Sequence, residues 1–294
     1  MQIPPSGPGT IRNAFTVDVE EYFQVEAFSD HVEKTDWEKY PRRIDQTADI
    51  ILGLLSSHKV KGTFFILGWL AERNPSLVAK IFSQGHEIAS HGFGHTMVTR
   101  MTPEEFRMDV RKAKKVLEGI TNTTVRGYRA PTFSIVEKTS WAYRILLEEG
   151  YRYSSSVFPI RHDRYGWPGF GNAPKRMHAI DGKEIWEVPM STWCFGSFNI
   201  PFGGGGYLRL YPWSLTKALF RKVTENGKPV VVYVHPWEFD PKHPMIDAPF
   251  LKRIRHHTGI AGMNKKIRYL LQYFQFGTVE QYLEDRIGSK SSRQ

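Results

Sequence analysis

Residues 61–95, KGTFFILGWLAERNPSLVAKIFSQGHEIASHGFGH, hold two short apolar runs on either side of an amphipathic one. The runs KGTFFILG (61–68) and HEIAS (86–90) predict buried strands, because they are short and bounded by Gly and charged residues. Between them, SLVAKIFSQG (76–85) predicts a helix that ends at Gly85. A strand, a helix and a second strand in succession indicate two parallel strands joined by a helical crossover.

The same alternation continues on both sides of this segment. Thr102, Pro103 and Glu105 form a capping signal, which predicts that a helix begins just after residue 101. Strands that alternate with helices are typical of an α/β fold, a parallel sheet covered by helices, either open or closed into a barrel. The further strands are expected at 13–20, 124–131, 151–157, 184–190 and 229–237, and the further helices at 43–58, 101–119, 139–150 and 212–227.

Two stretches interrupt the alternation. Residues 159–183 and 200–212 are rich in Gly and Pro, and we expect long surface loops there. The second stretch contains Gly203 to Gly206, but no Lys-Ser/Thr pair follows, so a nucleotide phosphate loop is not expected. Because no repeat or linker is visible, we predict a single domain. Its limits are 13–285, between a flexible N-terminal segment (1–12) and a C-terminal tail (286–294).

The composition restricts the class of protein. Among 294 residues Cys194 is the single cysteine, so a disulfide within the chain and a cluster of several thiolates on zinc are both excluded. Any metal must be held by nitrogen and oxygen. The sequence has no apolar run typical of a signal peptide and none long enough to span a membrane. We therefore expect a cytoplasmic protein, with the inner face of the membrane as a second location.

The formal net charge of +10 raises the question of an anionic partner. Lys and Arg do not gather on a recognisable reading element, so nucleic acid is not expected. The most basic part comprises LKRIRHHTG (251–259) and NKKIRYLLQYF (264–274), where apolar residues recur at helical spacing. One interpretation is a solvated helix packed through its apolar face. The other is peripheral contact with an anionic membrane or a lipid-linked substrate.

Polar residues stand where the expected strands end. Asp18 and Glu20 share one side of the first strand, because side chains alternate along a strand. His91 and His95 follow the strand at 86–90. The two glycines between them disfavour a helix and allow a tight loop in which both imidazoles converge on one point.

Arg129 and His235 lie at the ends of two further strands. Taken alone, each residue has an ordinary structural interpretation, such as an ion pair for Arg129 or a hydrogen-bonded histidine for His235. Together, two histidines and one or two carboxylates at strand ends match the open site of a hydrolytic zinc or iron centre. The other histidines lie in loops or charged runs, and we assign them no role: His31, His58, His86, His162, His178, His243, His256 and His257.

At this point the chain resembles a known family, the polysaccharide deacetylases with a NodB homology domain. Within it the chain is similar to the subfamily encoded in exopolysaccharide loci with the exosortase/PEP-CTERM system. The likeness covers nearly all of residues 13–285, and its order and spacing are specific. It is carried by FTVDVEEYFQVEAF (15–28), HEIASHGFGHTMV (86–98), VRGYRAPTFSI (125–135) and VVVYVHPWEFDP (230–241), with YRYSSSVFPIRHDRYGWP (151–168) and PFGGGGYLRLYP (201–212) between them.

The resemblance implies a distorted (β/α) barrel of about seven parallel strands. It also implies metal-dependent removal of acetyl groups from N-acetylated sugars. The residues that match the family's motifs are Asp18 as catalytic base, His91 and His95 as metal ligands, Arg129 as the residue that orients the base, His235 as general acid, and the backbone N–H of Thr132 as oxyanion donor.

The sequence departs from the family pattern at Val19, where the family has a second aspartate that binds the metal. Glu20 is the obvious substitute ligand, although Asp18 could itself bind the metal. The acidic partner of the acid histidine is also open, with Glu238 and Asp163 as candidates.

The expected activity is removal of N-acetyl groups from amino sugars of an exopolysaccharide or its lipid-linked precursor. Zinc is the expected metal, although iron, cobalt or nickel suits the same ligands. Trp193 and Trp237 are candidate platforms for stacking on a sugar ring. Two alternatives remain: an amidohydrolase acting on a small amide, and a glycan-binding protein that has lost its chemistry, an alternative that the departure at Val19 keeps open. The sequence makes no prediction of an oligomeric state.

Overall fold

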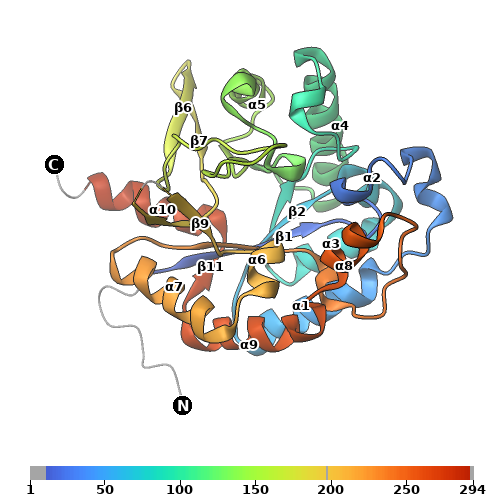
Figure 1. Ribbon diagram of the computed structural model, residues 1–294. Coiled ribbons are helices and arrows are strands. Elements are labelled where there is room, and N and C mark those ends of the chain that lie inside the picture. The colour runs from blue at the N-terminus through green and yellow to red at the C-terminus, as the bar shows by residue number, and fades with distance from the viewer. Residues whose placement is uncertain (1–10, 197, 292–294) are drawn as a thin grey trace.

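The computed structural model describes residues 11–196 and 198–291, and its centre is a sheet wrapped by helices (Figure 1). The strands are β1 (Asn13–Val19), β2 (Thr63–Ile66), β3 (Glu87–Ser90), β4 (Gly127–Tyr128), β5 (Tyr153–Ser154), β6 (Lys175–Ile180), β7 (Lys183–Glu187), β8 (Thr192–Phe195), β9 (Phe198–Pro201), β10 (Val231–Val234) and β11 (Phe276–Gly277).

The helices alternate with these strands, as the sequence predicts. They are α1 (Ile44–Ser57), α2 (Gly68–Arg73), α3 (Pro75–Ser83), α4 (Pro103–Thr121), α5 (Ala142–Glu148), α6 (Gly205–Leu210), α7 (Trp213–Glu225), α8 (Phe250–His257), α9 (Met263–Tyr273) and α10 (Val279–Ser291). The capping box at the start of α4 is present, since the Thr102 side chain accepts from the Glu105 backbone N–H and the Glu105 carboxylate accepts from that of Thr102. In the described part of the chain, no helix is both long and apolar enough to cross a bilayer.

The largest sheet has the strand order β10-β1-β2-β3-β4-β5-β7-β6, with β11 also paired to β1. Every neighbouring pair from β10 to β7 is parallel, and only the pair of β6 with β7 is antiparallel. This succession of seven parallel strands confirms the predicted α/β fold and the barrel-like curvature that the resemblance implies.

The barrel is distorted because β7 and β10 are not hydrogen-bonded to each other. The chain after β7 spans the opening instead: the Ser191 hydroxyl accepts from the Val231 backbone N–H at 2.8 Å. The Tyr233 backbone N–H donates to the Gly203 carbonyl at 3.1 Å. A Cβ at Gly204 would lie 2.2 Å from the Tyr233 carbonyl oxygen. The glycine run therefore allows close packing against β10.

Alternation along β1 separates the two faces of the barrel wall. Phe15, Val17 and Val19 belong to the large apolar cluster shared with the surrounding helices. Ala14 belongs to a second cluster inside the barrel, and Thr16 and Asp18 share its side of the strand. The start of α10 lies against the amino ends of β2 and β3, where its first backbone N–H groups donate to Thr63 and Glu87. The opposite, carboxyl end of the barrel is left for the site.

The two expected loops are confirmed only in part: residues 159–174 form no helix or strand, but both stretches also contain regular structure. Residues 175–180 form β6, which pairs with β7 through a tight turn at Asp181 and Gly182, both at positive φ. An Asp-Gly pair is a strong hairpin signal, because it tolerates the left-handed conformations of a two-residue turn. In the second stretch, α6 begins within the glycine run, at Gly205, and residues 198–201 form β9.

The structure does not test the predicted domain limits. Residues 1–10 of the N-terminal segment and 292–294 of the C-terminal tail lie outside the described residues. Helix α10 continues through Ser291, past residue 285, where we expected the domain to end.

Candidate metal-dependent hydrolase site

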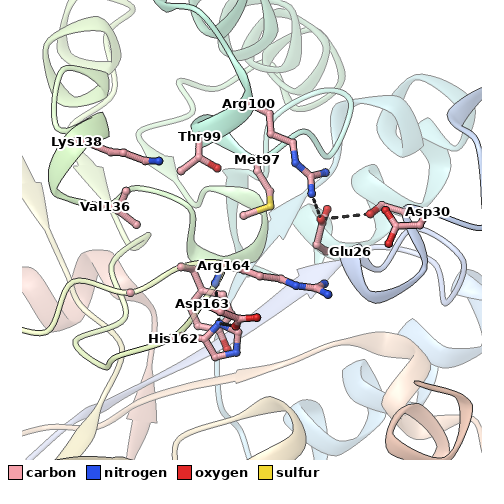
Figure 2. A pocket seen from close by; sticks show the side chains of 13 residues that line it. Glu26, Asp30, Met97, Thr99, Arg100, Val136, Lys138, His162, Asp163 and Arg164 are labelled. Carbon is pink, nitrogen blue, oxygen red and sulfur yellow. Dashed lines mark hydrogen bonds and ion pairs between the residues drawn. The ribbon is translucent and has the colours of Figure 1, made fainter. Parts of the chain in front are cut away.

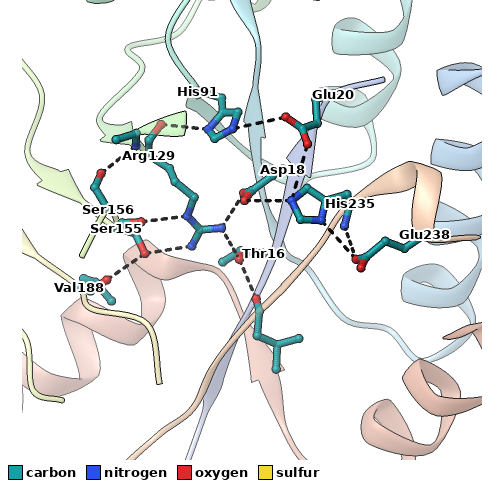
Figure 3. Close-up of polar contacts among 12 residues, drawn as sticks. Thr16, Asp18, Glu20, His91, Arg129, Ser155, Ser156, Val188, His235 and Glu238 are labelled. Carbon is teal, nitrogen blue, oxygen red and sulfur yellow. Dashed lines mark hydrogen bonds and ion pairs between the residues drawn. The ribbon is translucent and has the colours of Figure 1, made fainter. Parts of the chain in front are cut away.

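Five polar side chains converge at the carboxyl end of the barrel (Figure 3). Asp18 lies near the end of β1 and Glu20 just after it. His91 follows β3, Arg129 follows β4, and His235 follows β10. These strands are parallel, so their ends meet at one edge of the sheet. All but His235 are deeply buried.

The loop that carries His91 and His95 is not helical, as predicted. Gly92 and His95 both have positive φ. The half-buried Asp109 of α4 holds this loop: its carboxylate accepts from the backbone N–H groups of Phe93 and Gly94 at 2.8 and 3.1 Å. A Cβ at Gly92 would lie 2.8 Å from the Asp109 carboxylate, so a larger residue would disturb this contact.

The two histidines and Glu20 form a compact donor set. Their ligand atoms all lie within 4.8 Å of one another, and the three side chains are buried. His95 Nε2 lies 2.6 Å from Glu20 Oε2, and His91 Nε2 lies 4.0 Å from the same oxygen. Glu20 Oε2 nevertheless accepts no hydrogen bond within the described residues. A buried carboxylate oxygen without a donor, facing two imidazole nitrogens, fits a divalent cation.

The charge states of these groups also suit a metal. Burial lowers the pKa of His91 to about 4, which keeps its imidazole neutral. His91 Nδ1 lies 2.9 Å from the Arg129 carbonyl oxygen, so Nδ1 carries the proton and Nε2 has a free lone pair. Burial by itself raises the pKa of Glu20, but the neighbouring His95, His235 and His91 together outweigh burial and bring the pKa to about 2. Glu20 is therefore an anion.

Asp18 is held by Arg129 and does not belong to the donor set of Glu20, His91 and His95. The fully buried guanidinium donates to Asp18 Oδ1 at 2.6 Å and to the Thr16 hydroxyl at 2.7 Å. It also donates to the carbonyl and hydroxyl of Ser155 at 3.0 and 2.9 Å. Asp18 Oδ2 stays free of Arg129 and lies 3.9 Å from His235 Nε2. Glu20 therefore lies with the two histidines, whereas Asp18 is held by Arg129.

His235 contacts Glu238, one of its two candidate partners. Glu238 Oε2 accepts from the His235 backbone N–H at 2.9 Å and lies 3.3 Å from Nδ1. Arg209 of α6 pairs with the other oxygen of Glu238 at 2.9 Å. Asp163, the second candidate, pairs with His162 instead.

The pKa of His235 reflects this contact. Burial lowers the pKa, but the hydrogen bond and the charge of Glu238 outweigh burial and raise the pKa to about 9. The imidazole is therefore protonated at neutral pH. Its Nε2 points toward Asp18 and Glu20 (Figure 3).

Apart from the fully buried Arg129, the ionisable groups at the barrel end line a cavity of about 330 Å³. Thr132 also lines it, with a positive φ of 57° that is strained for a β-branched residue. Trp237 lines it as well, but its ring is stacked on the rings of His235 and His256, with centroids 5.2 and 4.1 Å apart. Trp193 does not reach the cavity: it lies on β8 beside a separate small hollow.

Several residues around this cavity do not stand out in the sequence. The wall includes His162 and His256, to which we assigned no role, and Tyr165, Arg209 and Arg255. Glu26 and residues 162–165 also line a second hollow of about 480 Å³, which is drawn in Figure 2. The two hollows therefore share one wall and adjoin each other.

The fold and the donor set define a class: an α/β barrel with one candidate site for a divalent metal at the carboxyl ends of its strands. Comparison with known families is consistent with this class. Residues 37–153 match the polysaccharide deacetylase family, and residues 155–284 match a domain of unknown function, DUF3473. The chain is thus similar to polysaccharide deacetylases in its first half and to DUF3473 in its second half. Asp18 and Glu20 precede both matches, and His235 and Glu238 lie in the second.

Curated relatives share part of the chain. A peptidoglycan-N-acetylglucosamine deacetylase of Bacillus cereus is 33% identical over 93 residues, which are 31% of this chain and 34% of the relative. A chitooligosaccharide deacetylase of a Bradyrhizobium species is 30% identical over 82 residues, 28% of this chain and 37% of that relative. The chain therefore spans about a third of the length of these relatives.

Solved structures agree on the fold. A provisionally assigned polysaccharide deacetylase from Mycobacterium smegmatis has a TM-score of 0.59 at 19% identity, over 99% of this chain and 96% of that one. The allantoinase PuuE has a TM-score of 0.57 at 17% identity, over 94% and 90% of the two chains. At these identities the likeness concerns the fold alone.

Proposed function

We propose that this protein is a metal-dependent deacetylase that hydrolyses the N-acetyl group of an amino sugar in a glycan. The observation that carries the proposal is the pairing of two arrangements in one cavity. One is the buried donor set of Glu20, His91 and His95. The other is the pair formed by Asp18 and His235, which are held by Arg129 and Glu238 respectively.

Each residue then has a chemical role. Glu20, His91 and His95 would hold the cation, which when bound supplies a Lewis acid that activates water and polarises an amide carbonyl. Asp18 accepts the proton of the attacking water, and Arg129 keeps Asp18 ionised through a charge-assisted hydrogen bond. The backbone N–H of Thr132 donates to the oxyanion.

His235 supplies the last proton. A sugar amine anion is too basic to leave, so amide cleavage needs a general acid, and such help contributes about 10² to 10⁴ in rate. His235 is protonated at neutral pH and presents Nε2 to the cavity, while Glu238 fixes Nδ1. Val19, whose place the family gives to an aspartate, packs outward among the apolar side chains. Glu20 takes that aspartate's role, which argues against a lapsed, purely glycan-binding protein.

The substrate class follows from the shape and charge of the cavity. The adjoining hollow behind residues 162–165 gives room for sugars next to the one that reacts, which favours a polymer or oligosaccharide over a small amide. Lys252 and Arg255 line the cavity and favour an anionic neighbour, as in an exopolysaccharide or a lipid-linked precursor. We propose zinc as the metal. We propose the cytoplasm, at the inner face of the membrane, as the location.

Metal content and acetate release test the proposal together. Elemental analysis after identical loading and desalting should find about one ion per wild-type chain and none in the double variant His91→Ala/His95→Ala. His178→Ala, on the β6 hairpin, is the matched control and should keep the ion. Wild type and control should release acetate from N-acetylated oligosaccharides, and the double variant should not. A wild-type protein that binds no ion would refute the proposal.

A further inference from the structure

The helix α8 and the chain before it present an unusual exposed surface. Four of the eleven large hydrophobic side chains that are exposed in the described residues fall between residues 245 and 254, so the exposure is clustered. We call these four the apolar ridge: Met245 is 63% exposed, Phe250 66%, Leu251 78% and Ile254 45%. Clustered exposed apolar side chains mark sites of interaction.

Helical geometry places cations on both sides of this ridge. At 100° per residue, Phe250, Leu251 and Ile254 lie within one stripe of α8 about 100° wide. Lys252 and Arg255 follow on one side of the stripe, and Arg253 lies on the other. Within the described residues neither Arg253 nor Arg255 forms an ion pair.

The opposite face of α8 is firmly anchored, so the ridge is held outward. His256 is buried and stacks on Trp237 with centroids 4.1 Å apart. Its ring also contacts the edge of Phe28 at 4.8 Å. Ile246, next to Met245, is buried in the main apolar cluster. The exposed side chains therefore belong to a fixed surface.

The neighbouring basic helix α9 is used differently. Ile267, Leu270 and Leu271 are buried, and Lys266 Nζ donates to the carbonyls of residues 208, 209 and 211 at the end of α6. For residues 264–274 the structure thus bears out the packed-helix interpretation. Of the exposed large hydrophobic side chains, α9 carries Tyr273 at its end, whereas Phe250, Leu251 and Ile254 lie together on α8.

We propose that the apolar ridge and its flanking cations dock on an anionic lipid bilayer. Apolar side chains that enter the acyl boundary between Lys and Arg at headgroup level are the pattern of an interfacial helix. Charge favours the same partner, because residues 241–279 contain seven Lys and Arg and a single acidic residue, Asp247. Docking of this surface on a second copy would bring like charges together.

The position of the ridge links docking to the candidate site. Lys252 and Arg255 on α8 also line the catalytic cavity, so one helix contacts both the bilayer and the mouth of the site. Docking would place the cavity at the membrane surface, where a lipid-linked glycan is presented. This last consequence rests on the proposed deacetylase function, whereas docking itself does not.

Co-sedimentation of the full chain with vesicles tests the proposal. The probes are vesicles of phosphatidylcholine with about 30 mol% phosphatidylglycerol, and vesicles of phosphatidylcholine alone. We expect binding to the anionic vesicles only, and at least about a tenfold fall in the partition coefficient for Phe250→Ser/Leu251→Ser. A similar fall is expected for Arg253→Gln/Arg255→Gln, and binding should weaken as salt rises.

Met108→Ser is the matched control, because Met108 is exposed on α4 and should leave vesicle binding unchanged. Melting temperatures establish that each variant is folded. The proposal is overturned if the wild type does not bind anionic vesicles. It is also overturned if the Phe250→Ser/Leu251→Ser variant binds them as well as the wild type does. A wild-type dimer that this variant abolishes without any vesicle binding overturns it too, since a second copy then covers the ridge. Vesicle binding by the inactive His91→Ala/His95→Ala variant would separate docking from catalysis.

Discussion

Replacing Glu238 by Gln should convert His235 from an acid that works up to high pH into one that works only at low pH. In the wild type the hydrogen bond and charge of Glu238 outweigh burial and bring the pKa of His235 to about 9. Gln has nearly the same size and keeps a hydrogen-bonding group, but it removes the negative charge. The pKa of His235 should then fall to about its ordinary value of 6.5.

The size of the effect follows from the two pKa values. At pH 8 the protonated fraction of His235 falls from about 0.9 to about 0.03, so activity should fall about thirtyfold. At pH 6 the fraction stays above about 0.7, and activity should fall less than about twofold. The expected signature is therefore a loss that grows with pH.

The assay is kcat/KM for acetate release between about pH 5.5 and 9.5, at equal metal occupancy. Glu184→Gln is the matched control, because Glu184 pairs with Arg176 at 2.6 Å on the distant β6–β7 hairpin. Its profile should follow the wild type. Melting temperatures are needed as well, since Glu238→Gln leaves the buried Arg209 without its anion. A Glu238→Gln profile parallel to the wild type, or an equal loss at pH 6 and pH 8, would refute the reasoning.

Three further changes have distinct expected outcomes. Glu20→Gln should lose the ion while Asp18→Asn keeps it, as measured by elemental analysis; the reverse pattern would make Asp18 the ligand. Arg129→Met should lower the free energy of unfolding by about 3 to 5 kcal/mol in urea titrations, because Asp18 is left as an unpaired buried charge, and a loss below about 1 kcal/mol would contradict this. Glu87 has a pKa raised by burial to about 7, so its stabilisation is complete below pH 4.5 and is lost as pH rises through 7. Glu87→Gln should therefore remove about 2 kcal/mol of the pH dependence of the unfolding free energy. This is less than the full pKa shift implies, because Glu87 is partly exposed. An unfolding free energy that depends on pH as steeply as in the wild type would count against this prediction.

The sequence predicts which side chains converge at the carboxyl end of the barrel, and the reason is physical. Parallel strands bring their carboxyl ends to one edge, so the ends of β1, β3, β4 and β10 could be listed without knowing the packing. Alternation along β1 correctly separates Val17 and Val19, which pack outward, from Asp18. The glycine between each His and Phe93 correctly predicts a loop.

The surroundings of the site depend on contacts between distant segments. Asp109 holds the histidine loop from α4, and Arg209 reaches Glu238 from α6. Neither partner follows from local spacing, because the helices must first be placed against the sheet. A polar residue on the apolar stripe between Phe106 and Val110 was the available signal for Asp109. Trp193 is an aromatic residue of a separate hairpin, and its type alone says nothing about distance to the cavity.

The hairpin at β6 and β7 shows a different kind of error. The Gly and Pro content of residues 159–183 predicts irregular structure, but Asp181 and Gly182 encode a tight turn between two strands. The average composition of residues 159–183 does not reveal the turn, because the turn depends on Asp181 and Gly182 alone.

The pairing of β1 with β10 has a consequence for synthesis of the chain. Ala14 pairs with Val231, so one edge of β1 lacks its β10 partner until more than two hundred further residues have been synthesised. Such long-range pairing slows folding and leaves an unpaired strand edge in the nascent chain. Glu20, His91 and His95 emerge from the ribosome well before His235. The three candidate metal ligands are therefore synthesised before the proposed acid.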